Sequence, residues 1–142
     1  MPTKEQLERL EEANALLRLI GSHGRRFFWC NDDSPDGYYA HFTFNDGRLY
    51  YVDEISKKSI YLGRTLFGNN WPFFSHSGRV RALVESIRDY ILRGTPVPHN
   101  KIATPRDWDN SRAGNIWGYS KEAAAAVRQA ATAMPMISVS SF

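Results

Sequence analysis

Hydrophobic residues recur at helical spacing in the N-terminal segment of the chain. The residues that recur in this way are Leu7, Leu10, Leu17 and Ile20. They follow TKEQ at 3–6, where a threonine and a glutamine three positions later match the capping box of a helix start. Gly21 stands where a C-terminal cap belongs. The pattern predicts a helix over about 4–20.

From residue 25 onward, the period of the pattern changes from helical spacing to two. Short runs rich in aromatic and β-branched residues follow one another, namely RRFFWC, YYAHFTF, RLYYVDEI and SIYLG. The segment Asn45-Asp46-Gly47 separates the second and third runs, and its glycine tolerates the positive φ that a tight turn needs. The sequence therefore predicts a meander of three or four antiparallel strands.

The register of the central hairpin depends on the length of its turn. A three-residue loop over 45–47 would place on the core face Phe42, Phe44, Tyr50 and Val52. The opposite face would then carry Tyr39, His41, Thr43 and Tyr51. A slip of one residue would exchange these sets.

After this meander the chain returns to helical spacing. One apolar stripe is formed by Val80, Leu83, Val84, Ile87 and Ile91. It predicts a helix that begins near residue 78 and ends at Gly94, beyond which Pro96 prevents its continuation. Residues 95–118 have no clear period and are expected to form a long loop, which in a small domain is usually functional or mobile.

The C-terminal part predicts one more helix. Ser120 is placed to cap an alanine-rich helix that runs to about Met134, where Pro135 stops it. The tail MISVSSF is prone to β structure and is expected either to fray or to add an edge strand. The resulting fold class is α+β: an N-terminal helix, a meander, and two helices separated by a long loop. We expect a single domain over 1–142.

Composition narrows the functional classes. A hydrophobic fraction of 42% with 13% aromatic residues excludes a fully disordered chain. The apolar runs are too short to span a bilayer, and the N-terminal segment lacks the apolar region of a secretory signal. Cys30 is the only cysteine, so we expect no internal disulfide, no cysteine-based zinc site and a reduced, cytoplasmic setting.

Several local motifs resemble known sites but fail on spacing. DGYYAHFTF resembles the aromatic motif of RNA-recognition domains, in which rings on a sheet stack on bases. That fold has a helix between its first two strands, and the order of elements predicted here does not. His41-Phe42-Thr43 is half of the paired motif of two-histidine phosphoesterases, and the second half is missing. Asp32-x-Ser34-x-Asp36-Gly37 begins like a calcium loop, but its twelfth position is Thr43, so an acidic hairpin turn is expected. We expect a structural His41, no metal, no cofactor and no enzymatic activity.

The start of the helix near residue 78 is the strongest candidate site. Arg79 and Arg81 lie in its first turn, where the partial positive charge of a helix disfavours further cations. Free N–H groups at such an end attract anions, and the preceding rings would stack on a base or fill a partner's pocket. The candidate residues are Trp71, Phe73, His76, Ser77, Arg79 and Arg81. In the alternative interpretation the rings belong to the core and the arginines point into solvent.

The 95–118 loop is a second candidate contact surface. It presents residue types that are enriched at binding hot spots, namely Arg106, Trp108, Arg112 and Trp117. The chain has 18 Lys and Arg against 15 Asp and Glu, a formal net charge of +3, and the basic excess lies in 79–93. This asymmetry allows an anionic partner without requiring one.

The segment FSHSGRVRALVESIRDYILRGTPVP resembles reading frames of phages and prophages. Small size and the lack of a catalytic motif are similar to the anti-defence class, which includes anti-CRISPR proteins. The resemblance implies a non-enzymatic protein that inhibits a host nucleic-acid-handling complex through protein–protein contacts in the host cytoplasm. The alternative is a nucleic-acid or nucleotide binder that uses the aromatic and arginine residues near residue 78. Neither hypothesis involves a membrane.

Overall fold

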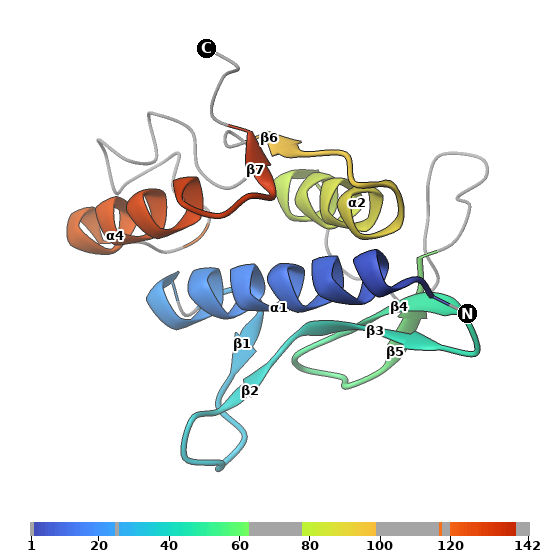
Figure 1. Ribbon diagram of the computed structural model, residues 1–142. Coiled ribbons are helices and arrows are strands. Elements are labelled where there is room, and N and C mark those ends of the chain that lie inside the picture. The colour runs from blue at the N-terminus through green and yellow to red at the C-terminus, as the bar shows by residue number, and fades with distance from the viewer. Residues whose placement is uncertain (1, 25, 63–77, 99–116, 118–119, 139–142) are drawn as a thin grey trace.

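Helix, strands and further helices follow one another in the structure, a computed structural model that describes residues 2–24, 26–62, 78–98, 117 and 120–138. The described helices are α1 (Lys4–Gly24), α2 (Gly78–Arg93) and α4 (Lys121–Thr132). The described strands are β1 (Trp29–Cys30), β2 (Tyr38–Tyr39), β3 (His41–Asn45), β4 (Arg48–Val52), β5 (Ser59–Tyr61), β6 (Val97–Pro98) and β7 (Ile137–Ser138). This order confirms the predicted α+β class (Figure 1).

Helix α1 begins at the predicted capping box but runs past its predicted end. The Thr3 backbone N–H donates to Gln6 Oε1 at 2.9 Å, and the Gln6 N–H donates to Thr3 Oγ1 at 3.1 Å. Gly21 does not terminate the helix. A Cβ at Gly21 would stand 3.2 Å from the backbone oxygen of Phe28, so the glycine lets the following chain pack closely against α1.

The predicted meander is divided between two sheets. Strands β3, β4 and β5 form an antiparallel sheet in that order, whereas β1 and β2 pair with each other. The division occurs at Ala40, whose N–H donates to the Phe28 carbonyl at 3.0 Å, away from the three-stranded sheet. The run from Tyr38 to Asn45 therefore pairs first with β1 and then with β4.

The register of the β3–β4 hairpin corrects the prediction. Asn45 pairs with Arg48, so the turn has two residues, Asp46 and Gly47, both with positive φ. Such a turn matches the twist of the flanking strands. The core face consequently carries Phe42, Phe44, Leu49 and Tyr51, while Tyr50 and Val52 share the outer face with His41 and Thr43. The shift by one residue on β4 follows from the shorter turn.

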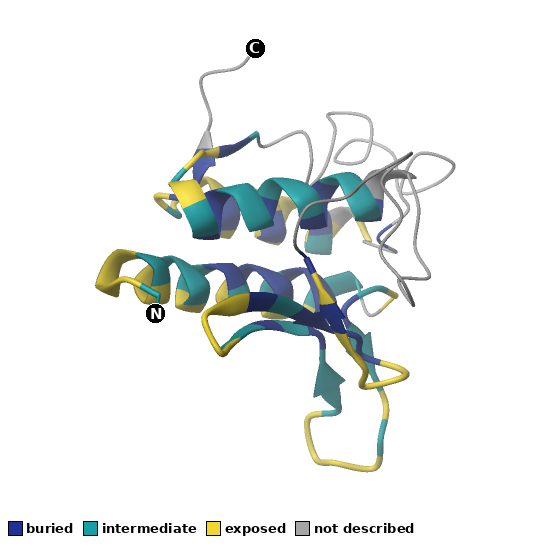
Figure 2. Cartoon of the chain, turned by 90° about the vertical axis from the view of Figure 1, so that its right-hand side faces the viewer, coloured by how far each residue is buried: buried dark blue, intermediate teal, exposed yellow. Residues whose placement is uncertain are grey.

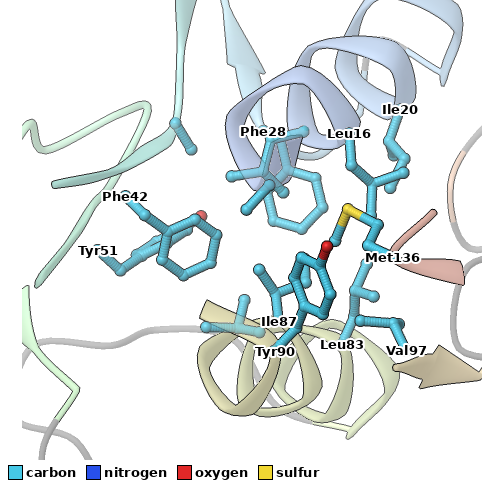
Figure 3. Close-up of a cluster of buried hydrophobic side chains, with 14 of the residues drawn as sticks. Leu16, Ile20, Phe28, Phe42, Tyr51, Leu83, Ile87, Tyr90, Val97 and Met136 are labelled. Carbon is cyan, nitrogen blue, oxygen red and sulfur yellow. The ribbon is translucent and has the colours of Figure 1, made fainter. Parts of the chain in front are cut away.

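Helix α1 lies between the three-stranded sheet and the pair α2 and α4 (Figure 1). Leu16 and Ile20 of α1 face Leu83 and Ile87 of α2 in the core (Figure 3). The whole apolar stripe predicted for α2 is buried. Burial of each apolar side chain of this size stabilises the fold by about 1.5–3 kcal/mol. Helix α1 contacts both the sheet and the other two described helices, so it contributes to the core on both sides.

The second half agrees with its predicted helix boundaries and adds a strand pair. Gly94 has a φ of +80° and follows the last residue of α2. Ser120 caps α4 by accepting the Ala123 N–H at 3.0 Å. Val97 pairs with Ile137 in a parallel β6–β7 ladder, so the start of the predicted loop joins the C-terminal tail. Among the described helices, none combines the length and apolar character needed to cross a membrane.

Candidate binding site on the β1–β2 hairpin

Most of the residues predicted from the sequence as a site lie outside the described part of the chain. These are Trp71, Phe73, His76, Ser77, Arg106, Trp108 and Arg112. Arg79 belongs to the first turn of α2, and its side chain is also outside the described part. Arg81 and Trp117 are described, and Trp117 is buried where a surface contact was expected.

Arg81 is paired within its own helix. Its Nε donates to Glu85 Oε1 at 3.0 Å, in the i,i+4 arrangement that stabilises helices, and only 17% of its side chain is exposed. The charge that was expected at the helix start is therefore compensated one turn further on.

Trp117 is a core residue and not a surface contact. Its exposed fraction is 0%, and its ring packs edge-on against Phe27 at 5.7 Å and at a tilt against Phe28 at 5.8 Å between centroids. Burial of an indole ring removes a large apolar area from water. This gain explains why Trp117 is buried although it follows a long segment without hydrophobic periodicity.

The β1–β2 hairpin is the most distinct described feature outside this core. Trp29 pairs with Tyr39, and Cys30 pairs with Tyr38. The connecting loop over 31–37 extends away from the helices (Figure 1). Most of its residues are exposed (Figure 2). This loop is the acidic hairpin turn expected from the NDDSPDG stretch.

Hydrogen bonds within the loop hold it in one shape. The Asp33 N–H donates to Asn31 Oδ1 at 3.3 Å, and the Ser34 N–H donates to Asp32 Oδ1 at 3.1 Å. The Gly37 N–H donates to the Ser34 carbonyl at 3.2 Å. These bonds give the backbone N–H groups of the loop partners within the loop itself, as in Asx turns.

Trp29 closes the base of the loop. Its Nε1 donates to the Asp36 carbonyl at 3.0 Å. The indole lies so close to Gly37 that a Cβ there would stand 2.3 Å from Nε1, and the φ of Gly37 is +76°. Only glycine fits both conditions.

A salt bridge connects the loop to the β4–β5 turn. Lys57 Nζ lies 3.2 Å from Asp32 Oδ2 and 4.5 Å from the centroid of the Tyr38 ring. The hydrogen bonds from Ser34 and the nearby Lys57 ammonium lower the pKa of Asp32 below its ordinary value. At neutral pH, Asp32 is therefore ionised, and its carboxylate is paired with Lys57.

Two hollows flank the hairpin where it meets α1. One, of about 330 Å³, is lined by Arg18, Trp29 and loop residues, and the other, of about 410 Å³, by Asn14, Arg18, Tyr38 and His41. Tyr39 lines both, and the Arg18 guanidinium lies 5.0 Å from the centroid of its ring. Each hollow thus combines aromatic rings and the Arg18 cation with polar residues, and the lining of the first also includes Asp36.

The described residues hold no group of three or more histidine, cysteine or acidic side chains arranged to bind a metal ion. His41 donates from its Nδ1–H to the Tyr39 carbonyl at 3.2 Å and packs against the Tyr38 ring. The sequence motifs discussed above include His41 and the loop over 31–37. Sequence reasoning missed Arg18, because nothing in the helical pattern of α1 indicates which exposed residue meets the hairpin.

Comparison with known proteins identifies a family and a relative. The family model described as YoqU matches residues 3–141. The SPbeta prophage-derived uncharacterized protein YoqU of Bacillus subtilis (strain 168) is 31% identical over 131 residues, which are 92% of this chain and 84% of that protein. No solved structure matches the chain. The origin of this relative supports the expected phage or prophage origin. Because the family model spans nearly the whole sequence, this chain belongs to the YoqU family.

Proposed function

We propose that this protein is a non-enzymatic binding protein of the anti-defence, anti-CRISPR-like kind. It acts in the host cytoplasm, where the β1–β2 hairpin contacts a host complex that handles nucleic acid and blocks it through protein–protein contacts. The observation that carries the proposal is the exposed loop over 31–37, held in one conformation by its own hydrogen bonds. A loop ordered in advance loses little conformational entropy on binding.

The charge of the loop favours a basic partner. Asp33 and Asp36 are exposed and form no ion pair with any described residue. Proteins that bind nucleic acid carry lysine and arginine surfaces that neutralise phosphates. An acidic hairpin is complementary to such a surface and competes with the phosphate backbone for it. The hollows beside Arg18 give room for partner side chains at the base of the contact.

The prophage origin of the relative supports the choice of a host complex. A protein carried by an integrated phage meets host proteins in the cell, and the complexes that threaten phage genomes are those that handle nucleic acid. This is the setting in which a small binding protein without catalytic groups is useful to a phage.

The test is a pull-down from host lysate, with and without nuclease treatment, using the wild type and the double variant Asp33→Asn, Asp36→Asn. We expect a host protein that is retained after nuclease treatment and lost with the double variant. The matched control is Glu8→Gln, Glu11→Gln, which neutralises two exposed carboxylates on α1 and should retain the partner. Equal capture by both double variants would contradict the role of the hairpin, and loss of every partner after nuclease would favour a nucleic-acid binder.

A further inference from the structure

The outer face of the β3–β4–β5 sheet adjoins the hairpin site at His41, which also lines one of the two hollows, and otherwise consists of other residues. Register places on this face His41, Thr43, Asn45, Arg48, Tyr50, Val52, Ser59 and Tyr61. Helix α1 covers the opposite face, and no described helix lies over the outer one (Figure 1). Beside the polar side chains that are usual on such a face, the outer face carries two tyrosines and an exposed arginine, Arg48.

Two tyrosines form a pair across β4 and the edge strand β5 on this face. Tyr50 and Tyr61 are directly opposite each other on β4 and β5, with ring centroids 5.7 Å apart and planes tilted by 49°. Tyr61 is 49% exposed, which is unusual for so large a ring. Neither hydroxyl has a hydrogen-bond partner among the described residues. The pair offers ring surface to a planar ligand.

Cations accompany the rings at both ends of β4. The Arg48 guanidinium lies 5.8 Å from the Tyr61 centroid and forms no ion pair with a described residue. At the other end, Tyr38 packs against His41 at 6.1 Å, with Lys57 above Tyr38. Four residue steps separate these two ends of β4, which is roughly 13 Å.

We infer that this face, defined by Arg48, Tyr50, Tyr61 and His41, binds single-stranded nucleic acid. Bases stack on the tyrosine pair, and Arg48 contacts a backbone phosphate. Single strands fit better than a duplex, because a base must leave its own stack to lie flat on a ring. Asp46 precedes Arg48 by two residues, and Asp32 pairs with Lys57, so these carboxylates offset the nearby cations and stacking contributes most of the affinity.

This inference does not depend on the proposed function, because its residues lie outside the hairpin loop and its test uses no host partner. The experiment measures fluorescence anisotropy of labelled oligothymidylate and oligouridylate, with a duplex of equal length for comparison. The main variant is Tyr61→Val, which removes the ring and keeps a good strand former. Tyr61→Phe keeps the ring and removes the hydroxyl.

We expect the Kd of Tyr61→Val for single strands to rise roughly five- to hundredfold, with Tyr61→Phe close to the wild type. Tyr39→Val, which removes a tyrosine at the hairpin, is the matched control and should bind normally. Wild type without affinity for either oligonucleotide, a preference for the duplex, or equal Kd values for Tyr61→Val and wild type would overturn the inference.

A second pair of variants tests the phosphate contact without altering either tyrosine. Arg48→Ala should weaken binding and reduce the salt slope by about 0.7 for one lost phosphate contact. The control is Arg26→Ala, since Arg26 also lies over a ring, 5.6 Å from the Phe27 centroid, but not on this face. An unchanged slope for Arg48→Ala, or the same change for Arg26→Ala, would mean that Arg48 makes no such contact and would count against the assigned face.

Discussion

The side-chain amide of Asn14 pairs with both backbone groups of Phe42. The Phe42 N–H donates to Asn14 Oδ1 at 2.7 Å, and Asn14 Nδ2 donates to the Phe42 carbonyl at 3.0 Å. Helix α1 thereby occupies the backbone groups on the edge of β3 that a further strand would otherwise pair with. The same contact sets the position of α1 on the sheet and satisfies a partly buried peptide unit.

Loss of this pairing should destabilise the whole fold. Asn14→Ala leaves the N–H and the carbonyl of Phe42 without their partner, and each such loss costs about 1–3 kcal/mol. We expect the free energy of unfolding, measured by urea titration, to fall by about 2–4 kcal/mol. Asn45→Ala, at an exposed position of the same strand, serves as the control. Similar losses for the two variants would show that the amide pairing contributes nothing specific.

Gly37 should tolerate substitution less well than Gly94. Both have a positive φ, so alanine at either position is strained by about 1 kcal/mol or more. A Cβ at Gly37 would also stand 2.3 Å from Trp29 Nε1, whereas at Gly94 the nearest atom is the far end of Arg9, 3.7 Å away.

We therefore expect Gly37→Ala to displace the Trp29 indole and shift its N–H resonance, with a greater loss of melting temperature than Gly94→Ala. An unshifted indole resonance in Gly37→Ala would contradict the close packing at the base of the hairpin.

The ionisation of Asp32 should report the order of the hairpin loop. A hydrogen bond from the Ser34 side chain is the main cause of the lowered pKa of Asp32, ahead of the Ser34 backbone N–H and of Lys57. Ser34→Ala removes this side-chain bond and should therefore raise the pKa more than Lys57→Met. Because the folded pKa is lowered, the stabilisation is present above the unfolded value of 3.8 and disappears as the pH falls through the folded value. Carboxyl NMR titration of the three proteins measures this order, and a larger effect of Lys57→Met would be inconsistent with it.

Because of Tyr90, the packing of α1 against α2 should become less stable at alkaline pH. Its hydroxyl donates to Glu12 Oε2, and burial together with this bond raises the pKa of Tyr90 to about 12. A raised folded pKa means that the stabilisation is complete below the ordinary value of 10 and is lost as the pH rises from 10 to about 12.

Tyr90→Phe should remove part of this alkaline loss, as measured by urea unfolding at a series of pH values. Tyr50→Phe, which alters a hydroxyl with no described partner, should leave the profile as it is in the wild type. A wild-type profile for Tyr90→Phe would show that the hydroxyl and Glu12 are not coupled.

Local patterns in the sequence determined most of the helical structure. The capping box at 3–6, the apolar stripe of α2 and the Ser120 cap each act over one or two turns, so neighbouring residues contain the needed information. The hairpin signal of Asp46 and Gly47 was also visible for this reason. The sequence likewise marked the acidic loop over 31–37, whose composition is typical of a turn.

Tertiary structure decided the features that depend on residues distant in sequence. The register of β4 required the true length of its turn, and the extension of α1 past Gly21 required the chain near Phe28 to pack against it. Tryptophan is a residue type that is enriched at binding hot spots, but Trp117 is buried in the core, where its ring packs beside Phe28. Arg18 meets Tyr39 and Arg48 meets Tyr61 only after the chain has folded. Packing brings these side chains together. The sequence pattern indicates which face of an element is apolar, but it does not indicate which other element that face will contact.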